Sequence, residues 1–242
     1  MTINNIIEVK NDTYPEIEPV KERMDINIPL IKAENIPKRN GSIYVLTGSG
    51  GSGKTSLLLN MFKTKQLYRK KFHNIYYICP SVSFLSVKEH PFSEHENVYH
   101  ELNYSILEDI FKELVALKEQ EKKPVYSLII IDDMADSMKD PSILKILNRM
   151  IIKARHINCC FFFTLQSYYY FPKILRKQIT YITIFKPKNI EEWYSLSKEL
   201  FNMNQDDALK LYDYVFDRPY THLDVDTVSN IYYKNFNKLI LE

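Results

Sequence analysis

The sequence predicts an α/β fold in which helices cover both faces of a parallel sheet. Strand-like and helix-like segments alternate through five rounds, which is the pattern of parallel α/β proteins. One predicted strand, Tyr126–Asp133, is apolar on both faces, as buried parallel strands are. The length of 242 residues suits one such domain with room for a short appendage, and 45% apolar with 26% charged residues is an ordinary globular balance.

The predicted strands are short apolar runs rich in β-branched and aromatic residues. They cover Ser42–Gly48, Asn74–Pro80, Tyr126–Asp133, Asn158–Gln166 and Tyr181–Lys186. Apolar residues at helical spacing predict helices between and after these strands. The helices cover Lys54–Thr64, Tyr104–Glu121, a segment from Pro141 to about Arg155, Ile190–Leu200 and Gln205–Phe216, with one or two helical turns over Pro172–Gln178.

Three segments fall outside the alternation. Residues 1–40 are polar, contain four prolines and show no clean periodicity, so we expect an extended arm that lies on the domain or on a neighbour, ahead of a folded domain over 41–242. Residues 81–103 are mixed and polar, which predicts a loop. The stretch Tyr220–Tyr233 alternates as a hairpin does, with Asp224, Asp226 and Asn230 near its turn, so the chain ends in a helical and hairpin extension.

The charge balance does not by itself suggest a nucleic-acid partner. The net charge is only +2, so any contact with nucleic acid must come from local patches. Two basic runs could line a pore and follow phosphates, although charges solvated on a helix face are an equally good interpretation. The first run is Lys63, Lys65, Arg69, Lys70 and Lys71, and the second is Lys173, Arg176 and Lys177.

The cysteines and the apolar runs bear on the compartment. Cys79, Cys159 and Cys160 all lie in apolar stretches, which favours buried, reduced thiols. The N-terminus lacks a basic region followed by an apolar one, and the longest apolar runs are far shorter than a membrane span. We therefore expect an intracellular, reducing compartment, with no secretion signal and no contact with a membrane.

Residues 48–55, Gly-Ser-Gly-Gly-Ser-Gly-Lys-Thr, form a phosphate loop between a strand and a helix. Its glycines let backbone N–H groups point inward, and the following helix presents its positive end to the phosphates. Lys54 reaches the β- and γ-phosphates, and the Thr55 hydroxyl completes a Mg²⁺ shell. The loop predicts a P-loop NTPase that binds ATP. The predicted nucleotide-binding residues are Gly48, Ser49, Gly50, Gly51, Ser52, Gly53, Lys54, Thr55 and Ser56.

Two acids and a glutamine complete the predicted site. Asp132 ends an apolar strand, where a carboxylate can reach the Mg²⁺ beside Thr55. Asp133 follows it, and we assign this residue the role of polarising the attacking water as general base. Gln166 ends the fourth strand, where a polar side chain is unusual because core strands are apolar. Its amide suits a sensor that hydrogen-bonds the γ-phosphate or the attacking water.

These motifs, in this order and spacing, resemble the FtsK–HerA family of P-loop motors, and within it the poxvirus-type genome-packaging ATPases of large DNA viruses and virophages. The resemblance covers roughly residues 40–235. It is carried by Gly48–Thr55, Ile129–Asp133, Ala154-Arg155-His156 and Thr164–Ser167. The pairing of a strand-end glutamine with the preceding Lys-Ala-Arg segment is more specific than the phosphate loop, which many families share.

The resemblance implies a RecA-like core with sheet order 5-1-4-3-2 and a ring of five or six subunits that pumps double-stranded DNA into a preformed capsid. It implies partner proteins at the capsid vertex or elsewhere in the packaging machinery, because the large accessory domains of FtsK-like translocases are not seen. The compartment would be the host cytoplasm, in a viral factory, and also the virion. Arg155 is the first candidate for an arginine that completes a neighbour's site, followed by Arg176 and Arg149.

Other functions fit the residues less well. The alternative function is a P-loop kinase that transfers the γ-phosphate to a small acceptor, but such an enzyme needs an arginine-rich lid that the sequence does not reveal. A dinucleotide-binding protein would require a carboxylate at the end of the second strand, which ends Ile78-Cys79-Pro80. The sequence also lacks the base-reading motif of a GTP-dependent switch and the signature helix of an ABC-type ATPase. The intact Lys54 and Asp133 argue against a scaffold that binds ATP without hydrolysing it.

Overall fold

The computed structural model describes residues 27–120 and 123–241. Their strands form one sheet of nine strands in the order β3-β2-β4-β5-β1-β6-β7-β8-β9. The strands are β1 (Ile43–Thr47), β2 (Asn74–Ile78), β3 (Val98–Tyr99), β4 (Ser127–Asp132), β5 (Cys159–Leu165), β6 (Tyr181–Phe185), β7 (His222–Asp226), β8 (Ile231–Lys234) and β9 (Asn237–Lys238). The five predicted strands are all present and parallel, and their spatial order, β6-β1-β5-β4-β2, confirms the predicted order 5-1-4-3-2.

The sheet extends beyond these five strands at both edges. The predicted hairpin is confirmed: β7 pairs antiparallel with β6, β8 with β7, and the short β9 with β8. Asp224 does not lie near the turn as predicted, because it sits in the middle of β7 with a fully buried side chain. At the other edge, β3 pairs parallel with β2.

The predicted loop over residues 81–103 is therefore wrong in two places. A short helix, α2 (Ser81–Leu85), opens the segment, and β3 lies near its end. Pairing with another strand produces β3, because Tyr77 N–H donates to Asn97 O and Cys79 N–H donates to Tyr99 O. Such distant partners leave no periodic pattern in the segment itself.

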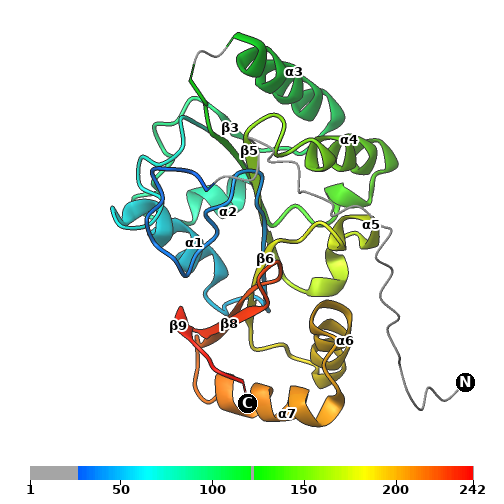
Figure 1. The fold of residues 1–242 in the computed structure, drawn as a ribbon. Helices are drawn as coiled ribbons and strands as arrows, with labels where there is room; N and C mark the ends of the chain where they lie inside the picture. The colour runs from blue at the N-terminus through cyan, green and yellow to red at the C-terminus, as the bar shows by residue number, and fades with distance from the viewer. Residues whose placement is uncertain (1–26, 121–122, 242) are drawn as a thin grey trace, which may run out of the picture.

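Helices cover both faces of the sheet, as predicted. Figure 1 shows α3, α4 and α6 on one side of the sheet, with α1 and α2 on the other. The longer helices are α1 (Lys54–Lys63), α3 (Tyr104–Gln120), α4 (Pro141–Ile152), α6 (Ile190–Phe201) and α7 (Gln205–Val215), and α5 (Lys173–Arg176) is a single turn. Asp140, Asn189 and Asn204 cap the N-termini of α4, α6 and α7 with their side chains.

Helix α4 ends three residues before the predicted limit at Arg155. The C-cap residue Lys153 leaves the helical conformation, and turns then lead to β5. Asn158 adopts a left-handed φ of 49° just before the strand begins. Asparagine tolerates this conformation better than most residues, so the chain reverses there without a glycine.

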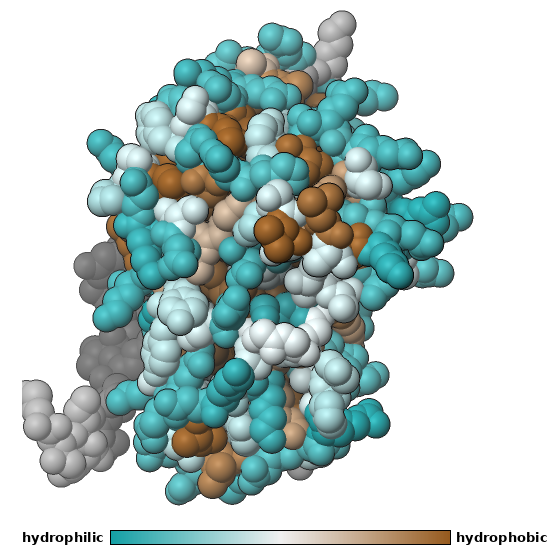
Figure 2. Space-filling view, turned by 180° about the vertical axis from the view of Figure 1, so that it is seen from behind, coloured by the Kyte–Doolittle hydropathy of each residue, from teal (hydrophilic) through white to brown (hydrophobic). Residues whose placement is uncertain are grey.

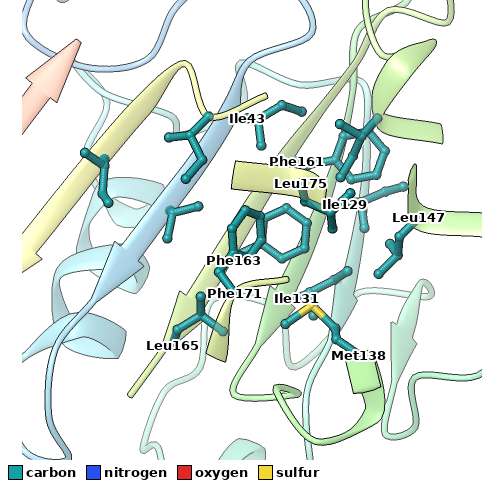
Figure 3. Close-up of a cluster of buried hydrophobic side chains, with 14 of the residues drawn as sticks. Ile43, Ile129, Ile131, Met138, Leu147, Phe161, Phe163, Leu165, Phe171 and Leu175 are labelled. Atoms are coloured by element: carbon teal, nitrogen blue, oxygen red, sulfur yellow. The ribbon is translucent and has the colours of Figure 1, made fainter. Parts of the chain in front are cut away.

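The sheet separates two hydrophobic clusters. Side chains alternate between the faces of each strand, so Phe161 and Phe163 of β5 lie in the larger cluster and Phe162 lies in the smaller one. Figure 3 shows part of the larger cluster, where Phe161, Phe163 and Leu165 pack with Ile129 and Ile131 of β4. Burying a side chain of this size contributes about 1.5–3 kcal/mol. The central strands therefore hold the loops at their carboxyl ends on a rigid base.

The predicted arm over residues 1–40 lies outside the described residues up to position 26. Residues 27–40 pack on the smaller cluster, where Ile28, Ile31 and Ile36 are buried. The hydroxyls of Tyr68 and Tyr181 donate to the carbonyls of Pro37 and Asn35, at 2.7 Å each. This part of the predicted arm is therefore integrated with the domain.

Cys79, Cys159 and Cys160 are free thiols and all are buried. Within 27–120 and 123–241, no helix has both the length and the hydrophobicity required to cross a bilayer. Figure 2 shows one face of the molecule as mainly hydrophilic, with small hydrophobic patches scattered over it.

Candidate nucleotide-binding site

The phosphate loop connects β1 to α1 at the carboxyl edge of the parallel strands. Gly48 has a φ of 155°, and a Cβ at this position would lie 2.6 Å from Cβ of Phe185, so a side chain there would clash. Gly53 precedes α1 with a φ of 104°, in the region that favours glycine. Helix α1 has neither a side-chain cap nor an acidic residue in its first turn. Its first N–H groups are therefore directed at any anion held by the loop.

Lys54 is held at the mouth of the loop. Its buried ammonium group donates to Gly48 O at 2.6 Å and to Ser49 O at 3.0 Å. These bonds use two of its three protons, which leaves one for a phosphate oxygen. Burial lowers the pKa of Lys54, and the carboxylates of Asp133 and Asp132 act against that shift. The side chain thus lies within electrostatic reach of both acids.

Asp132 is buried at the end of β4, with a side chain fixed from both neighbouring strands. It accepts hydrogen bonds from the hydroxyl of Tyr77 on β2, at 2.6 Å, and from the hydroxyl of Thr164 on β5. Burial raises the pKa of Asp132, while the bonds from Thr164 and Tyr77 lower it. A carboxylate kept in such a position is costly for stability, which favours a functional role for it.

Asp133 is exposed and turns away from the strand. Its φ of 56° is uncommon for a residue with a side chain, and strain of this kind gathers at functional sites. Thr164 holds the turn, because its hydroxyl and carbonyl oxygens accept from Asp133 N–H at 3.0 and 3.4 Å. The side-chain amide of Gln166, just after β5, donates to the two carboxylate oxygens at 3.2 and 3.3 Å. The two predicted residues therefore meet directly.

The donor set fits Mg²⁺ bound together with phosphates. No group of three or more histidine, cysteine, aspartate or glutamate side chains gathers as a metal cage within the described ranges. Mg²⁺ seldom needs such a cage, because one or two protein oxygens, phosphates and waters complete its octahedron. Asp132 receives one hydrogen bond on each carboxylate oxygen and keeps lone pairs on both. Asp132 and the hydroxyl of Thr55 are the oxygens that would hold the ion.

The segment after β5 closes one side of the loop. A cavity of about 190 Å³ lies between the loop, Gln166 and the end of β6 with the residues after it, including Phe185 and Lys188. Glu192 on α6 fixes this wall, since it accepts from Ser167 Oγ at 2.6 Å and from Tyr168 N–H at 2.7 Å. The position of Gln166 is thus set by both the strand before it and the helix opposite.

The structure does not bring Arg155 to this site. Arg155 is exposed and precedes β5, whereas Gln166 follows it, so the two lie at opposite ends of the strand. Arg176 is buried: it donates to Phe171 O and Tyr169 O and pairs with Glu199 at 3.0 Å. Arg149 lies over the ring of Phe111 on α3. Of the three candidates, Arg176 has a structural role, Arg149 is engaged with Phe111, and Arg155 lies at the end of β5 opposite to Gln166.

Three residues of the first basic run line a groove at the far end of α1. The groove has a volume of about 610 Å³, with Lys63, Arg69 and Lys70 among its lining residues and no carboxylate. None of these three pairs with a carboxylate of the described residues. We call this surface the basic groove. Its other lining residues are Phe62, Phe72, His73, Ile75, Pro91, Phe92 and His95. In the second run, Lys177 is exposed, but Arg176 is not.

Sequence reasoning missed several residues around the site. Tyr77 and Thr164 hold Asp132, and Phe185 packs against Gly48. A signal for Tyr77 existed, because the predicted sheet order places its strand beside the strand of Asp132. Tyr220, whose ring lies close to Gly53, had no such signal, because it comes from a turn far along the chain.

Comparison with known proteins places the chain among viral proteins. The family model described as Poxvirus A32 protein matches residues 34–213. The DNA packaging protein OPG160 of Vaccinia virus (strain Copenhagen) is 29% identical over 157 residues, which is 58% of this chain and 52% of that protein. OPG160 of Monkeypox virus is also 29% identical, over 58% of this chain and 46% of its own. The chain thus spans about half the length of these relatives.

Two solved structures share the fold. B204, the DNA-packaging ATPase from Sulfolobus Turreted Icosahedral Virus, is 21% identical, with a TM-score of 0.56 over 84% of this chain and 99% of that one. The genome packaging NTPase B204 from Sulfolobus turreted icosahedral virus 2, in complex with AMPPCP, is 21% identical, with a TM-score of 0.54 over 84% and 100% of the two chains. At this identity the likeness establishes the α/β fold of the P-loop ATPases.

Proposed function

The chain belongs to the poxvirus A32 protein family, and from that premise we propose that it is an ATP-hydrolysing motor that translocates double-stranded DNA and packages a viral genome into a preformed capsid. The observation that carries the proposal is the convergence of Lys54, Asp132, Asp133 and Gln166 at one edge of the sheet. The name of the Vaccinia virus relative, DNA packaging protein, supports DNA as the polymer that the motor moves.

Each residue of the site has a task in hydrolysis. The loop amides and Lys54 bind and orient the β- and γ-phosphates, which is most of what a protein does in phosphoryl transfer. Thr55 and Asp132 would hold Mg²⁺, which supplies charge neutralisation when bound. Asp133 takes the proton of the attacking water, because it is exposed beside Lys54 rather than buried like Asp132. Gln166 fixes the Asp133 carboxylate and can hydrogen-bond the same water.

The basic groove is the surface that we assign to DNA. Its cations lack carboxylate partners among the described residues, so they can neutralise phosphates without first breaking ion pairs. Lys63 is also the last residue of α1, whose first residue is Lys54 of the phosphate loop. One rigid helix about 15 Å long therefore connects the nucleotide to the proposed DNA surface.

Assembly into a homo-oligomeric ring of five or six subunits is part of the proposal. Such a ring would place an arginine of one subunit against the nucleotide of the next. Arg155 suits this role because it is exposed and lies at the edge opposite its own phosphate loop. The partners would be double-stranded DNA and proteins of the capsid vertex, in the viral factory of the host cytoplasm and in the virion.

Steady-state ATP hydrolysis by the purified chain, with and without long double-stranded DNA, tests this function when the mass is measured in parallel by light scattering. We expect DNA to stimulate turnover and the mass to be that of a ring. A monomer whose turnover ignores DNA would contradict the motor and favour transfer of the γ-phosphate to a small acceptor. Absence of turnover both alone and with DNA would contradict the enzyme itself.

A further inference from the structure

A second cavity adjoins the phosphate loop on the side away from the acids. It has a volume of about 620 Å³ and is bounded by the loop, by the residues after β6 and by the turn that follows α7. We call it the Tyr220 pocket. Its lining includes the side chains of Lys186, Lys188, Tyr212, Asp217, Arg218 and Tyr220.

Tyr220 is an exposed aromatic residue on a constrained backbone. The residue is 72% exposed, and its φ of 66° is strained for a bulky residue. The turn that carries it is anchored, because Thr221 Oγ1 donates to Arg218 O at 2.8 Å and Asp217 pairs with Lys234 at 2.9 Å. The fold thus holds an apolar ring in solvent, at a cost in both hydration and strain.

The ring lies beside the start of α1. A Cβ built on Gly53 would be 3.4 Å from Cδ1 of Tyr220 and 3.5 Å from Cε1 of Phe185. Both rings therefore flank the last glycine of the phosphate loop. Tyr220 presents its exposed surface next to the position that the phosphates of a nucleotide would occupy.

The order of the strands predicts which way a bound nucleotide would extend from the phosphate loop. Asp132, Asp133 and Gln166 lie at the ends of β4 and β5, on one side of β1 and its loop. The Tyr220 pocket is built from residues that follow β6 and precede β7, on the other side of β1. Two strand spacings separate the ends of β5 and β6, which is about 10 Å. A triphosphate with its γ-phosphate at the acids would therefore extend its base toward the pocket.

The charges in the pocket suit the same ligand. Lys186, Lys188 and Arg218 are cationic, and the one carboxylate among the lining residues, Asp217, is paired with Lys234. Lys186 lies over the ring of Tyr212 at 5.4 Å, which holds that cation near the loop. The pocket thus offers cationic groups for an α-phosphate or ribose beside an aromatic face for a base.

We infer that the Tyr220 pocket binds the nucleobase and ribose of the nucleotide, with Tyr220 stacking on the base. This inference rests on the proposed function, because it assumes that the loop holds the phosphates. It adds a ligand-binding residue outside the phosphate loop. Stacking needs the aromatic face and not the hydroxyl, so Tyr220→Phe should bind nucleotide as the wild type does.

The test compares the affinities of ATP and of inorganic tripolyphosphate, each with Mg²⁺, by calorimetry. Tyr220→Ala should weaken ATP binding on the order of tenfold, as expected for the loss of a base–aromatic stack, and leave tripolyphosphate binding unchanged. Tyr214→Ala is the matched control, because Tyr214 is 61% exposed on α7 but lies outside the pocket, beneath Lys234. Tyr220→Phe controls for folding and should keep full affinity for both ligands.

The other outcomes separate the two proposals. Unchanged ATP affinity in Tyr220→Ala, or equal weakening of ATP and tripolyphosphate, would overturn the stacking role and leave the phosphate site in place. A wild-type chain that binds neither ligand would overturn the proposed function, and the Tyr220 pocket with it.

Discussion

The side-chain amide of Gln166 lies 3.2 and 3.3 Å from the two carboxylate oxygens of Asp133, although 33 residues separate them in the chain. The contact joins the ends of two neighbouring parallel strands, β4 and β5. Thr164 strengthens this junction, since it binds both Asp132 and the N–H group of Asp133. The acids and the glutamine thus form one connected unit.

Asp133→Asn should keep ATP binding and lose hydrolysis. The amide cannot take a proton from water, and loss of a general base lowers rates by about 10²–10⁴-fold. ATP affinity from calorimetry and turnover from phosphate release check the two halves of the prediction. A large loss of affinity would show instead that Asp133 has a structural role. Asp136→Asn is the matched control, because Asp136 is an exposed acid that pairs with Lys139 and is not part of the proposed site.

Lys54→Ala should abolish turnover, because the phosphates lose their main cationic partner. Removal of one such donor is expected to cost on the order of 10²–10³-fold in rate. Lys63→Ala removes the same charge from the other end of α1 and should retain DNA-independent turnover. The measurement is ATP turnover of both variants. Near-normal turnover in Lys54→Ala would contradict the assignment of the phosphate site.

Arg155→Ala subunits should inactivate rings that also contain wild-type subunits. If each arginine completes the site of the neighbouring subunit, activity should fall faster than the fraction of wild-type chains when the variant is titrated in. The loss in a pure variant ring should be about a thousandfold or more. Arg149→Ala, which alters an arginine on α4, serves as the comparison. Activity strictly proportional to the wild-type fraction would exclude Arg155 from acting in trans.

Removing the charges of the basic groove should weaken DNA binding. The triple variant Lys63→Ala, Arg69→Ala and Lys70→Ala should reduce the slope of log affinity against log salt by up to about 2.7, because each phosphate that the protein neutralises adds about 0.9 to that slope. The measurement is DNA affinity at several salt concentrations. A control with the same charge change alters Lys112, Lys145 and Lys198, which lie on α3, α4 and α6. Equal losses in both variants would mean that only net charge matters.

His90 should make the fold sensitive to mild acid. Its ring packs between Phe84 and Tyr77, and burial, aided by Lys63, lowers its pKa. In the unfolded chain this histidine has its ordinary, higher pKa, so it binds a proton at a higher pH than in the folded chain. The free energy of unfolding therefore falls as the pH drops below about 6.5. Urea unfolding at pH 7.5 and 5.5 should show a smaller loss in His90→Asn, which keeps an acceptor for Phe92 N–H. An equal loss in the two proteins would contradict this assignment.

The core of the fold could be predicted because its signals are local. Each parallel strand is an apolar run, and the motifs at their ends fix the order through the family they resemble. The strand β3 and the buried position of Asp224 could not be predicted from such signals. Asp224 is stabilised by Thr183 on β6, at 2.6 Å, and this partner is known only once β6 and β7 pair. His222, two residues earlier on β7, also contacts the Asp224 carboxylate, at 3.0 Å.

The residues of the candidate site also fall into those that the sequence could predict and those that it could not. Lys54, Asp132, Asp133 and Gln166 could be named from the sequence because each belongs to a motif with known chemistry at the carboxyl end of a strand. Nothing in their own segments marks Tyr77 or Tyr220, and only for Tyr77 does the predicted sheet order offer a signal, because it places β2 beside β4. Tyr77 contacts Asp132, and the ring of Tyr220 lies beside Gly53; both partners are more than fifty positions away along the chain.

Both edges of the described sheet end in strands of two residues, β3 and β9. Strands this short offer few free N–H and C=O groups to another chain. Within the described part of the chain, copies therefore have little means of joining edge to edge into a continuous ribbon, which protects a crowded solution from fibrous aggregation. Within the described residues, the subunit contacts of the proposed ring would then use side chains of helices and loops, and such contacts can slide or open during a working cycle.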